Sequence, residues 1–341
     1  MRKRILSLIL ALAMMFSLAA TVSVTASAET SGDFEYSLLA DGTFEVTGYL
    51  GSAISLEIPS KHNLIPVTSI GFGAFSERSL LENVTIPDSI TNIGFCAFLN
   101  CTSLESITIP NSVTKIDGNA FSKCTGLTSI TIPDSVQSIG EWAFENCTAL
   151  TEVTMGDSVQ SIEKWAFENC KPLKSITFGK NVSSIGNLAF YNCTSLESIE
   201  LPYGIETISD STFYDCTALT NVTIPSSVTE IGWCAFGYLN DGQEVNPSFN
   251  IICGENSAAE EYAIENNLKY TSITYEYGDA NNDGNIDMLD VLLIRKYIAK
   301  QPVKPNLKTS DVTDDGNIDM LDVLLIRKYI AKQPVILGPK G

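Results

Sequence analysis

The sequence predicts a mostly β solenoid of 23-residue coils with short helices, followed by a small α-helical module built on two acidic loops. Three observations lead to this prediction. Phenylalanine recurs every 23 residues at eight positions, a 21-residue string near the C-terminus occurs twice at an offset of 32, and the composition changes near Gly278. Self-similarity at a fixed period is typical of repeat proteins, in which each unit packs on its neighbours.

The repeat has a constant internal pattern. Alanine precedes seven of the phenylalanines, Thr212 takes its place once, and leucine follows six residues after the first seven. The segment Leu104–Pro110 alternates apolar and polar residues and stops at proline, which predicts a short strand. One unit cannot bury its apolar face alone, so stacked units should form a continuous core. The phenylalanines are Phe75, Phe98, Phe121, Phe144, Phe167, Phe190, Phe213 and Phe236.

Six cysteines keep the same period. A disulfide framework is one interpretation for a secreted chain. The Cβ vectors of stacked residues, however, run parallel rather than converging, which disulfide geometry disfavours. We therefore favour buried free thiols that pack as small apolar groups. The six are Cys101, Cys124, Cys147, Cys170, Cys193 and Cys216.

The N-terminus has the features of a secretory signal peptide. Arg2, Lys3 and Arg4 precede an apolar run and a small-residue site that ends at Ala28, so residues 1–28 are expected to be removed. An uncleaved membrane anchor is the alternative, although the run is short for a bilayer span. No later segment is apolar enough to cross a membrane. We expect a secreted, extracellular mature chain.

The chain is strongly acidic. It carries 21 basic and 40 acidic residues, for a net charge of −19. Nucleic acids and anionic lipids bind through Lys/Arg patches, so neither is an expected partner. Solvation of an extracellular surface is a general explanation for much of this negative charge. A more specific explanation is that some of the carboxylates bind metal.

The repeats resemble the BspA-like leucine-rich repeats of bacterial surface proteins. The string Ser112–Pro133 carries the match, which covers roughly residues 67–236. The resemblance implies a leucine-rich-repeat type solenoid between two caps. The domains expected after the signal peptide are an N-terminal cap at 29–66, the solenoid at 67–248, a C-terminal cap at 249–275 and a last module at 276–341.

Both flanks have features of caps. Phe34 to Gly48 alternates around Asp41-Gly42, which predicts a β-hairpin. Ser257 to Asn267 predicts a short helix with Ser257 as its N-cap. Solenoids need such polar ends because their last coils would otherwise expose the core.

Each copy of the C-terminal duplication opens with the spacing of an EF-hand calcium loop. A hard cation takes six to eight oxygens, which this spacing supplies with Gly284 or Gly316 at the sharp turn. Two calcium ions are therefore expected; two acidic turns without metal are the alternative. The expected ligands are Asp279, Asn281, Asp283, Asn285, Asp287 and Asp290 in the first loop, and Asp311, Thr313, Asp315, Asn317, Asp319 and Asp322 in the second.

The duplicated loops, each followed by one helix, resemble type I dockerins, which bind the cohesin modules of bacterial cellulosomes. The resemblance covers residues 278 to about 335. This chain departs from the general EF-hand in having Asp at the twelfth position of both loops and Thr313 at a third position. The resemblance implies cohesin contacts at Met288, Leu289, Arg295, Lys296, Lys300, Met320, Leu321, Arg327, Lys328 and Lys332.

Helical spacing agrees with these contacts. Positions 288, 292 and 295 share one face of the first helix, whereas Val291 and Ile294 form a separate apolar stripe suited to a core. The Met-Leu pairs then lie at a basic, exposed surface, as an interface would require. The alternative is that they complete the small core. Because both copies carry this surface, two binding orientations are expected.

Recognition by the repeats is favoured over catalysis, with a glycoside hydrolase activity in an accessory to polysaccharide degradation as the alternative. The single histidine, His62, is interpreted as an exposed cap residue, and the acidic residues of the coils lie at variable positions without a sign of a paired site. Two aromatic columns are a candidate surface for glycan or protein, with local packing as the alternative. A structural spacer is a third interpretation. The columns are Trp142 with Trp165, and Tyr191 with Tyr214.

Overall fold

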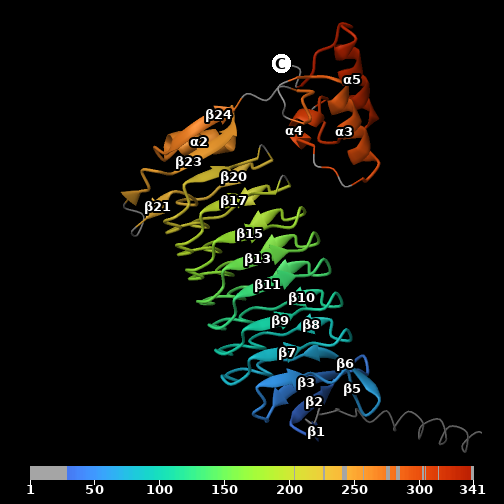
Figure 1. Cartoon of the computed structure of the whole chain (residues 1–341), viewed down its shortest axis with the longest axis vertical. Helices are drawn as coiled ribbons and strands as arrows, with labels where there is room; N and C mark the ends of the chain where they lie inside the picture. Colours follow the sequence, from blue (N-terminus) through green and yellow to red (C-terminus); the bar gives the residue numbers. More distant parts are fainter. Residues whose placement is uncertain are drawn as a thin grey trace, which may run out of the picture.

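The computed structural model describes residues 29–338, apart from 203, 226, 240–243, 256, 274–276, 282–284, 302, 304 and 314. The expected signal peptide lies outside the described residues. The described part forms a β solenoid with two caps and a separate helical module at the C-terminus (Figure 1). No described helix is both long and apolar enough to span a membrane.

A long sheet runs along one side of the solenoid. Its two-residue strands pair in parallel with equivalent residues opposed, as in Ile116 with Ile139 and Ile139 with Ile162. One residue of slip would move these isoleucines out of the core, which fixes the register. The strands are β8 (Asn92–Ile93), β10 (Lys115–Ile116), β12 (Ser138–Ile139), β14 (Ser161–Ile162), β16 (Ser184–Ile185), β18 (Thr207–Ile208) and β20 (Glu230–Ile231).

A second series of parallel strands contains the alternating segment of each repeat. The predicted strand of the segment Leu104–Pro110 is present as β9, with Ile107 buried and its neighbours exposed. The strands are β4 (Ser55–Glu57), β7 (Asn83–Thr85), β9 (Ser106–Thr108), β11 (Ser129–Ile132), β13 (Glu152–Met155), β15 (Ser175–Thr177), β17 (Ser198–Glu200), β19 (Asn221–Thr223), β23 (Asn250–Gly254) and β24 (Lys269–Ile273).

The periodic phenylalanines form one stacked column through the core. Neighbouring ring centroids from Phe75 to Phe236 lie 5.0 to 5.3 Å apart and the rings are within 9° of parallel. All eight side chains are buried. The predicted continuous core is therefore present, since each coil covers the ring of the next.

Turns rather than helices surround these phenylalanines. In each coil, backbone N–H groups of the turn donate to the following coil, as Phe98 does to Ala120 and Phe144 to Ala166, both at 2.8 Å. Two residues per coil adopt positive φ, for example Trp142 (54°) and Asn146 (58°). The expected short helices are few, because this bonding between coils replaces the bonding within a helix.

The predicted N-terminal hairpin forms from β2 (Phe34–Leu38) and β3 (Phe44–Tyr49), with β1 (Glu29–Ser31) paired to β2. A second hairpin joins β5 (Lys61–His62) to β6 (Ile65–Ile70). His62 is buried, contrary to expectation. Its ring stacks on Tyr36 with centroids 4.1 Å apart, and the edge of Phe44 also contacts it. Aromatic neighbours from another hairpin cover it, which local sequence does not indicate.

The C-terminal cap contains β21 (Tyr238–Leu239), β22 (Glu244–Val245) and the predicted helix, α2 (Ala258–Glu265). Ser257 caps α2 by accepting from the N–H of Glu260 at 3.2 Å. The last module contains α3 (Met288–Ile298), α4 (Leu307–Ser310) and α5 (Met320–Ile330). Its small core includes Ala280, Val291, Ile294, Val312, Val323 and Ile326.

The six periodic cysteines are buried and free. Each thiol donates to the carbonyl of a phenylalanine 26 residues earlier, as Cys147 does to Phe121 at 3.2 Å and Cys170 to Phe144 at 3.2 Å. Burial raises the pKa of Cys170 to about 12, and it raises the pKa of Cys216 to about 12 as well. The thiols therefore serve as buried, protonated packing groups.

The thiol column should make the solenoid sensitive to alkali. Above the ordinary cysteine pKa of 9.0, the unfolded chain releases thiol protons that the folded chain retains up to about pH 12 at Cys170. The free energy of unfolding should therefore fall by about 1.4 kcal/mol per pH unit for each such thiol. Guanidinium unfolding between pH 8.5 and 10.5 with a phosphine reductant measures the slope. Cys170→Ala should reduce the slope by about that amount, and an unchanged slope would contradict the assignment.

Candidate functional site

The second acidic loop is folded around two aspartates. The carboxylate of Asp311 accepts from the N–H groups of Asp315 (3.2 Å) and Gly316 (2.8 Å). Asp322 Oδ1 accepts from the N–H and the hydroxyl of Thr313, at 3.1 and 3.0 Å. Three expected metal ligands, at positions one, three and twelve of the loop, therefore meet in one place.

The twelfth residue of each loop also fixes the start of the following helix. Asp322 Oδ2 accepts from the N–H of Asp319 at 2.8 Å, while Asp319 Oδ1 accepts from the N–H of Leu321 at 2.6 Å. This reciprocal arrangement is a capping box, and Asp287 with Asp290 forms the same box on α3. The aspartate at the twelfth position thus belongs both to the loop and to the first turn of the helix that follows the loop.

Asp290 closes the first loop from inside α3. Its Oδ1 accepts from the N–H groups of Ala280 at 2.8 Å and Asn281 at 3.1 Å. Burial raises the pKa of Asp290 above its ordinary value. The expected ligand Asp283 and the turn residue Gly284 lie outside the described residues.

These loops bury negative charge. Asp290 and Asp322 are 0% exposed, and Asp279 and Asp311 are also buried. Buried carboxylates are stable when they are paired with positive charge or coordinate a metal. In the described part of the chain, no ion pair joins Asp290, Asp311 or Asp322 to a basic side chain. A cation bound in each loop would supply positive charge to these carboxylates.

The donor chemistry fits calcium. Carboxylate, amide, hydroxyl and carbonyl oxygens are the ligands that this ion prefers. Among the described residues, no three Asp, Glu, His or Cys side chains are already gathered as a metal cluster; the loop carboxylates accept from backbone N–H groups instead. A bound ion would supply the positive charge that these aspartates require.

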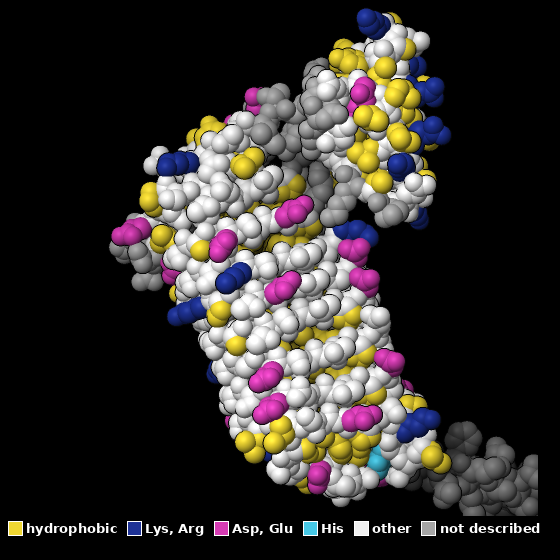
Figure 2. Space-filling view, in the orientation of Figure 1, with side chains coloured by type: hydrophobic (Ala, Val, Ile, Leu, Met, Phe, Trp, Pro, Cys, Tyr) yellow, Lys and Arg dark blue, Asp and Glu magenta, His cyan; other side chains and the backbone are white. Residues whose placement is uncertain are grey.

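The expected partner-binding side chains lie on the exposed faces of α3 and α5. Met288 is 54% and Met320 is 55% exposed, and Leu289 and Leu321 are exposed too. Figure 2 shows apolar side chains gathered on the visible face of this module, with Lys and Arg at its edge. The Met-Leu pairs therefore do not complete the core.

Two further leucines belong to the same surface. Leu292 and Leu324 are exposed at equivalent positions of α3 and α5. They were not among the expected contacts, although the helical face shared by positions 288, 292 and 295 indicates them. The basic residues Arg295 and Arg327 are exposed beside them. We call the exposed residues 288, 289, 292 and 295 with their equivalents 320, 321, 324 and 327 the helix-face pair.

The tryptophan column is a weak platform for sugars. Trp142 and Trp165 stack with centroids 4.6 Å apart and 3° between planes, so each covers one face of the other. The Lys164 ammonium lies 4.9 Å from the Trp165 centroid and 5.8 Å from that of Trp142. A sugar needs an open ring face, and this pair has lost its inner faces to mutual stacking.

The tyrosine column is a correction to the expected ligand surface. Tyr191 and Tyr214 have centroids 5.5 Å apart, but Tyr214 is only 7% exposed.

Two neighbouring glutamates were candidates for a paired carboxylate site. Burial raises the pKa of Glu168, with the neighbouring charge of Glu145 adding to the effect. Neither Glu145 nor Glu168 lines either of the two described pockets, so these two glutamates do not form a catalytic site in them.

Comparisons with known proteins agree with this architecture. Residues 51–171, 114–242 and 143–269 match a family model for BspA type leucine rich repeat regions, and residues 277–331 match the type I dockerin domain. A search of curated proteins finds no match.

Solved structures with similarity are also repeat proteins. A leucine rich cell surface protein from Faecalibacterium prausnitzii is 28% identical over 67% of this chain and 77% of its own, with a TM-score of 0.44. A leucine rich repeat protein from T. pallidum is 25% identical over 73% of this chain and 100% of its own, with a TM-score of 0.49.

Calcium removal is expected to unfold the C-terminal module and leave the solenoid folded. A small module has a marginal core, and ion binding adds about 4 kcal/mol when free calcium is a thousandfold above Kd. Circular dichroism and thermal unfolding of the full chain, in calcium and in EDTA, test this. EDTA should lower the helical signal and leave the main unfolding transition, that of the solenoid, in place.

Substitutions test the same assignment. Asp322→Asn should lower the stability of the C-terminal module, whereas Asp88→Asn in the solenoid should leave that stability unchanged. An identical profile with and without EDTA would contradict the calcium assignment.

Proposed function

Because the chain belongs to the BspA-type leucine-rich repeat family and ends in a type I dockerin domain, we propose that it is a non-catalytic extracellular protein that docks onto a scaffold through its C-terminal module. The partner is a cohesin module of a cellulosome-type scaffold. The supporting observation is the helix-face pair, an exposed apolar surface carried twice beside the two acidic loops. Neither matched family is catalytic.

Docking depends on the loops and helices acting together. The aspartates that would hold calcium also cap α3 and α5, through Asp290 in the first copy and Asp322 in the second. Bound calcium would supply the charge that keeps each loop closed. The loops then hold both helices in the orientation that presents the Met-Leu pairs, so affinity for the partner should depend on calcium.

The chemistry of the surface defines the partner. Exposed methionine and leucine side chains favour an apolar hollow on the cohesin, because their burial would provide most of the binding energy. The flanking arginines and lysines favour an acidic rim around that hollow. The whole chain carries a net charge of −19, so the basic residues of this surface contrast with the overall charge.

The solenoid is the cargo in this proposal. Repeat proteins present extended surfaces to proteins or polymers, and the match to a repeat family supports such a role here. We propose recognition or adhesion as its role, with a protein or a carbohydrate as the ligand. The proposed location is outside the cell, attached to the scaffold.

The two helix faces are expected to be interchangeable. Leu289→Glu with Lys296→Glu removes the face on α3, and Leu321→Glu with Lys328→Glu removes the matched face on α5. Each pair alone should weaken cohesin binding only about twofold, since one of two equivalent modes is lost. The four changes together should weaken binding more than about a hundredfold, because two apolar anchors are replaced by charged side chains and two positive charges become negative.

Calorimetry with cohesins in calcium measures these affinities, and circular dichroism verifies that each variant is folded. Loss of binding from one pair alone would contradict interchangeable modes. Full binding by the fourfold variant would contradict the assigned surface itself.

A further inference from the structure

Two phenylalanines near the N-terminal end of the solenoid are stacked on each other and exposed to solvent. Phe72 follows β6 and Phe95 follows β8, with ring centroids 5.8 Å apart and 8° between the ring planes. Phe72 is 75% and Phe95 is 43% exposed, whereas the eight periodic phenylalanines are buried. Large apolar side chains that lie together on a surface, unlike single ones, are typical of interaction sites. We call Phe72 and Phe95 the exposed phenylalanine pair.

The solenoid covers this pair from one side. A Cβ added at Gly118 would lie 3.1 Å from the ring of Phe95, so that ring rests against the turn of the following coil. Phe95 in turn stacks on one face of Phe72. Because three quarters of the surface of Phe72 is exposed, the ring face that points away from Phe95 is available to a partner.

A carboxylate is held beside the exposed phenylalanine pair. The side chain of Glu45 lies over the backbone just before Phe72, since a Cβ added at Gly71 would lie 2.7 Å from Glu45 Cδ. The Ser69 hydroxyl donates to Glu45 Oε1 at 3.0 Å, and the amide of Asn92 donates to the Ser69 hydroxyl at 3.4 Å. Hydrogen bonds from β6 and β8 therefore orient this carboxylate.

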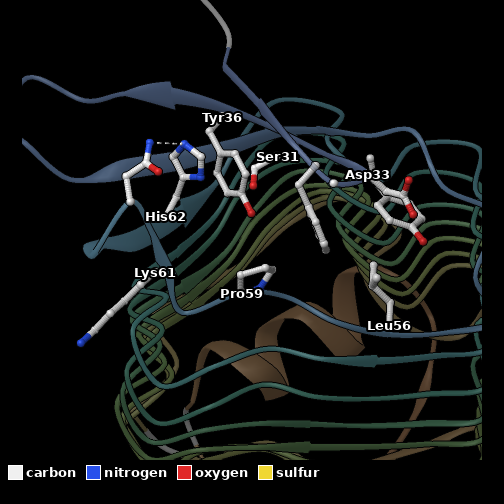
Figure 3. A pocket seen from close by; sticks show the side chains of 11 residues that line it. Ser31, Asp33, Tyr36, Leu56, Pro59, Lys61 and His62 are labelled. Carbon is white, nitrogen blue, oxygen red and sulfur yellow. Dashed lines mark hydrogen bonds between the residues drawn. The ribbon is translucent and has the colours of Figure 1, made fainter.

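The chain does not supply a cation to this carboxylate. Among the described residues, no basic side chain forms an ion pair with Glu45. Lys61, in the N-terminal cap, extends away from the other labelled residues of the cap (Figure 3). The faces of aromatic rings are electrostatically negative, so a ring beside a carboxylate attracts positive charge. The chemistry of this site therefore favours a cation from another molecule.

The solenoid contains an internal example of the same chemistry. The Lys164 ammonium lies 4.9 Å from the Trp165 centroid and 5.8 Å from that of Trp142. It is also 3.3 Å from Glu141 Oε1. The tryptophans occur in the turns that follow β12 and β14, as the exposed phenylalanine pair occurs in the turns that follow β6 and β8. A stacked aromatic pair and a carboxylate thus hold a cation at one point along the solenoid.

We propose that the exposed phenylalanine pair and Glu45 bind a basic segment of a protein partner. A guanidinium of the partner would lie on the open face of Phe72 and pair with Glu45, while the aliphatic stem of the same side chain covers the ring. The net charge of −19 favours the approach of a basic partner. This inference rests on the proposed recognition role of the repeat domain and is independent of docking by the C-terminal module.

Titration of the full chain in calcium with synthetic peptides tests the inference. The probe is a short peptide in which arginine alternates with serine, and the reference is the same peptide with citrulline, a neutral isostere, in place of arginine. Calorimetry should show that the arginine peptide binds about tenfold more tightly, because citrulline loses both the cation–π contact and the ion pair.

Matched substitutions locate the bound peptide. Phe72→Leu keeps an apolar side chain but removes the ring, so it should weaken binding of the arginine peptide about fivefold. Glu45→Gln should weaken it about threefold, because one paired charge is lost at a partly exposed site. Two controls should leave the affinity unchanged: Glu105→Gln, which removes the same charge just before β9, and Ile264→Leu, which changes an exposed residue of α2.

An unchanged melting temperature shows that Phe72→Leu and Glu45→Gln keep the fold. Equal affinity for the two peptides, no binding of either, or binding that both substitutions leave intact would overturn the inference. A glycan and protein binding array with the same preparations separates this site from the recognition role itself. Array ligands that both variants still bind would support that role and overturn this site. Cohesin binding by the same preparations distinguishes either failure from failure of the docking proposal.

Discussion

Negative charge buried in the two C-terminal loops is the constraint on which the account depends. Asp290 and Asp322 are fully buried and hold both the loops and the starts of α3 and α5. Such charge is costly without a cation, and no described basic side chain supplies one to these two residues. A metal would therefore be part of the fold of this module, and the exposed helix faces would exist only when it is bound.

The solenoid follows a different principle of stability. Its core is a column of parallel rings and thiols in which every coil covers the next. Such a structure needs neither metal nor disulfide, because each interface between coils is equivalent to its neighbour. Under the proposed function, the chain would join a solenoid that folds without an ion to a module that depends on one, so that docking would respond to calcium while recognition by the repeats would not.

Much of this organisation follows from the sequence, because periodic residues face periodic neighbours. The Phe column, the strand at Ile107, the hairpin at Asp41 and the cap at Ser257 were predicted and are present. The interiors of the caps were not predictable in this way. The burial of His62 arises from hairpins that meet only in three dimensions, one of them with a bulge between Glu35 and Tyr36.

Variable positions were predicted less well for a related reason. Whether a side chain such as Tyr214 is open or covered depends on what the adjacent coils place around it. Trp142 and Trp165 even occupy positive φ, where the first coil has Gly73. The pattern of the repeat defines where such residues lie, but neighbours decide whether they are available to a ligand.

Direct calcium uptake tests the central claim. Calorimetric titration of calcium into the chelator-treated full chain should show two ions bound per chain, and Asp322→Asn should remove one of them. A chain that takes up no calcium would contradict the account, because its buried aspartates would then be stabilised in some other way.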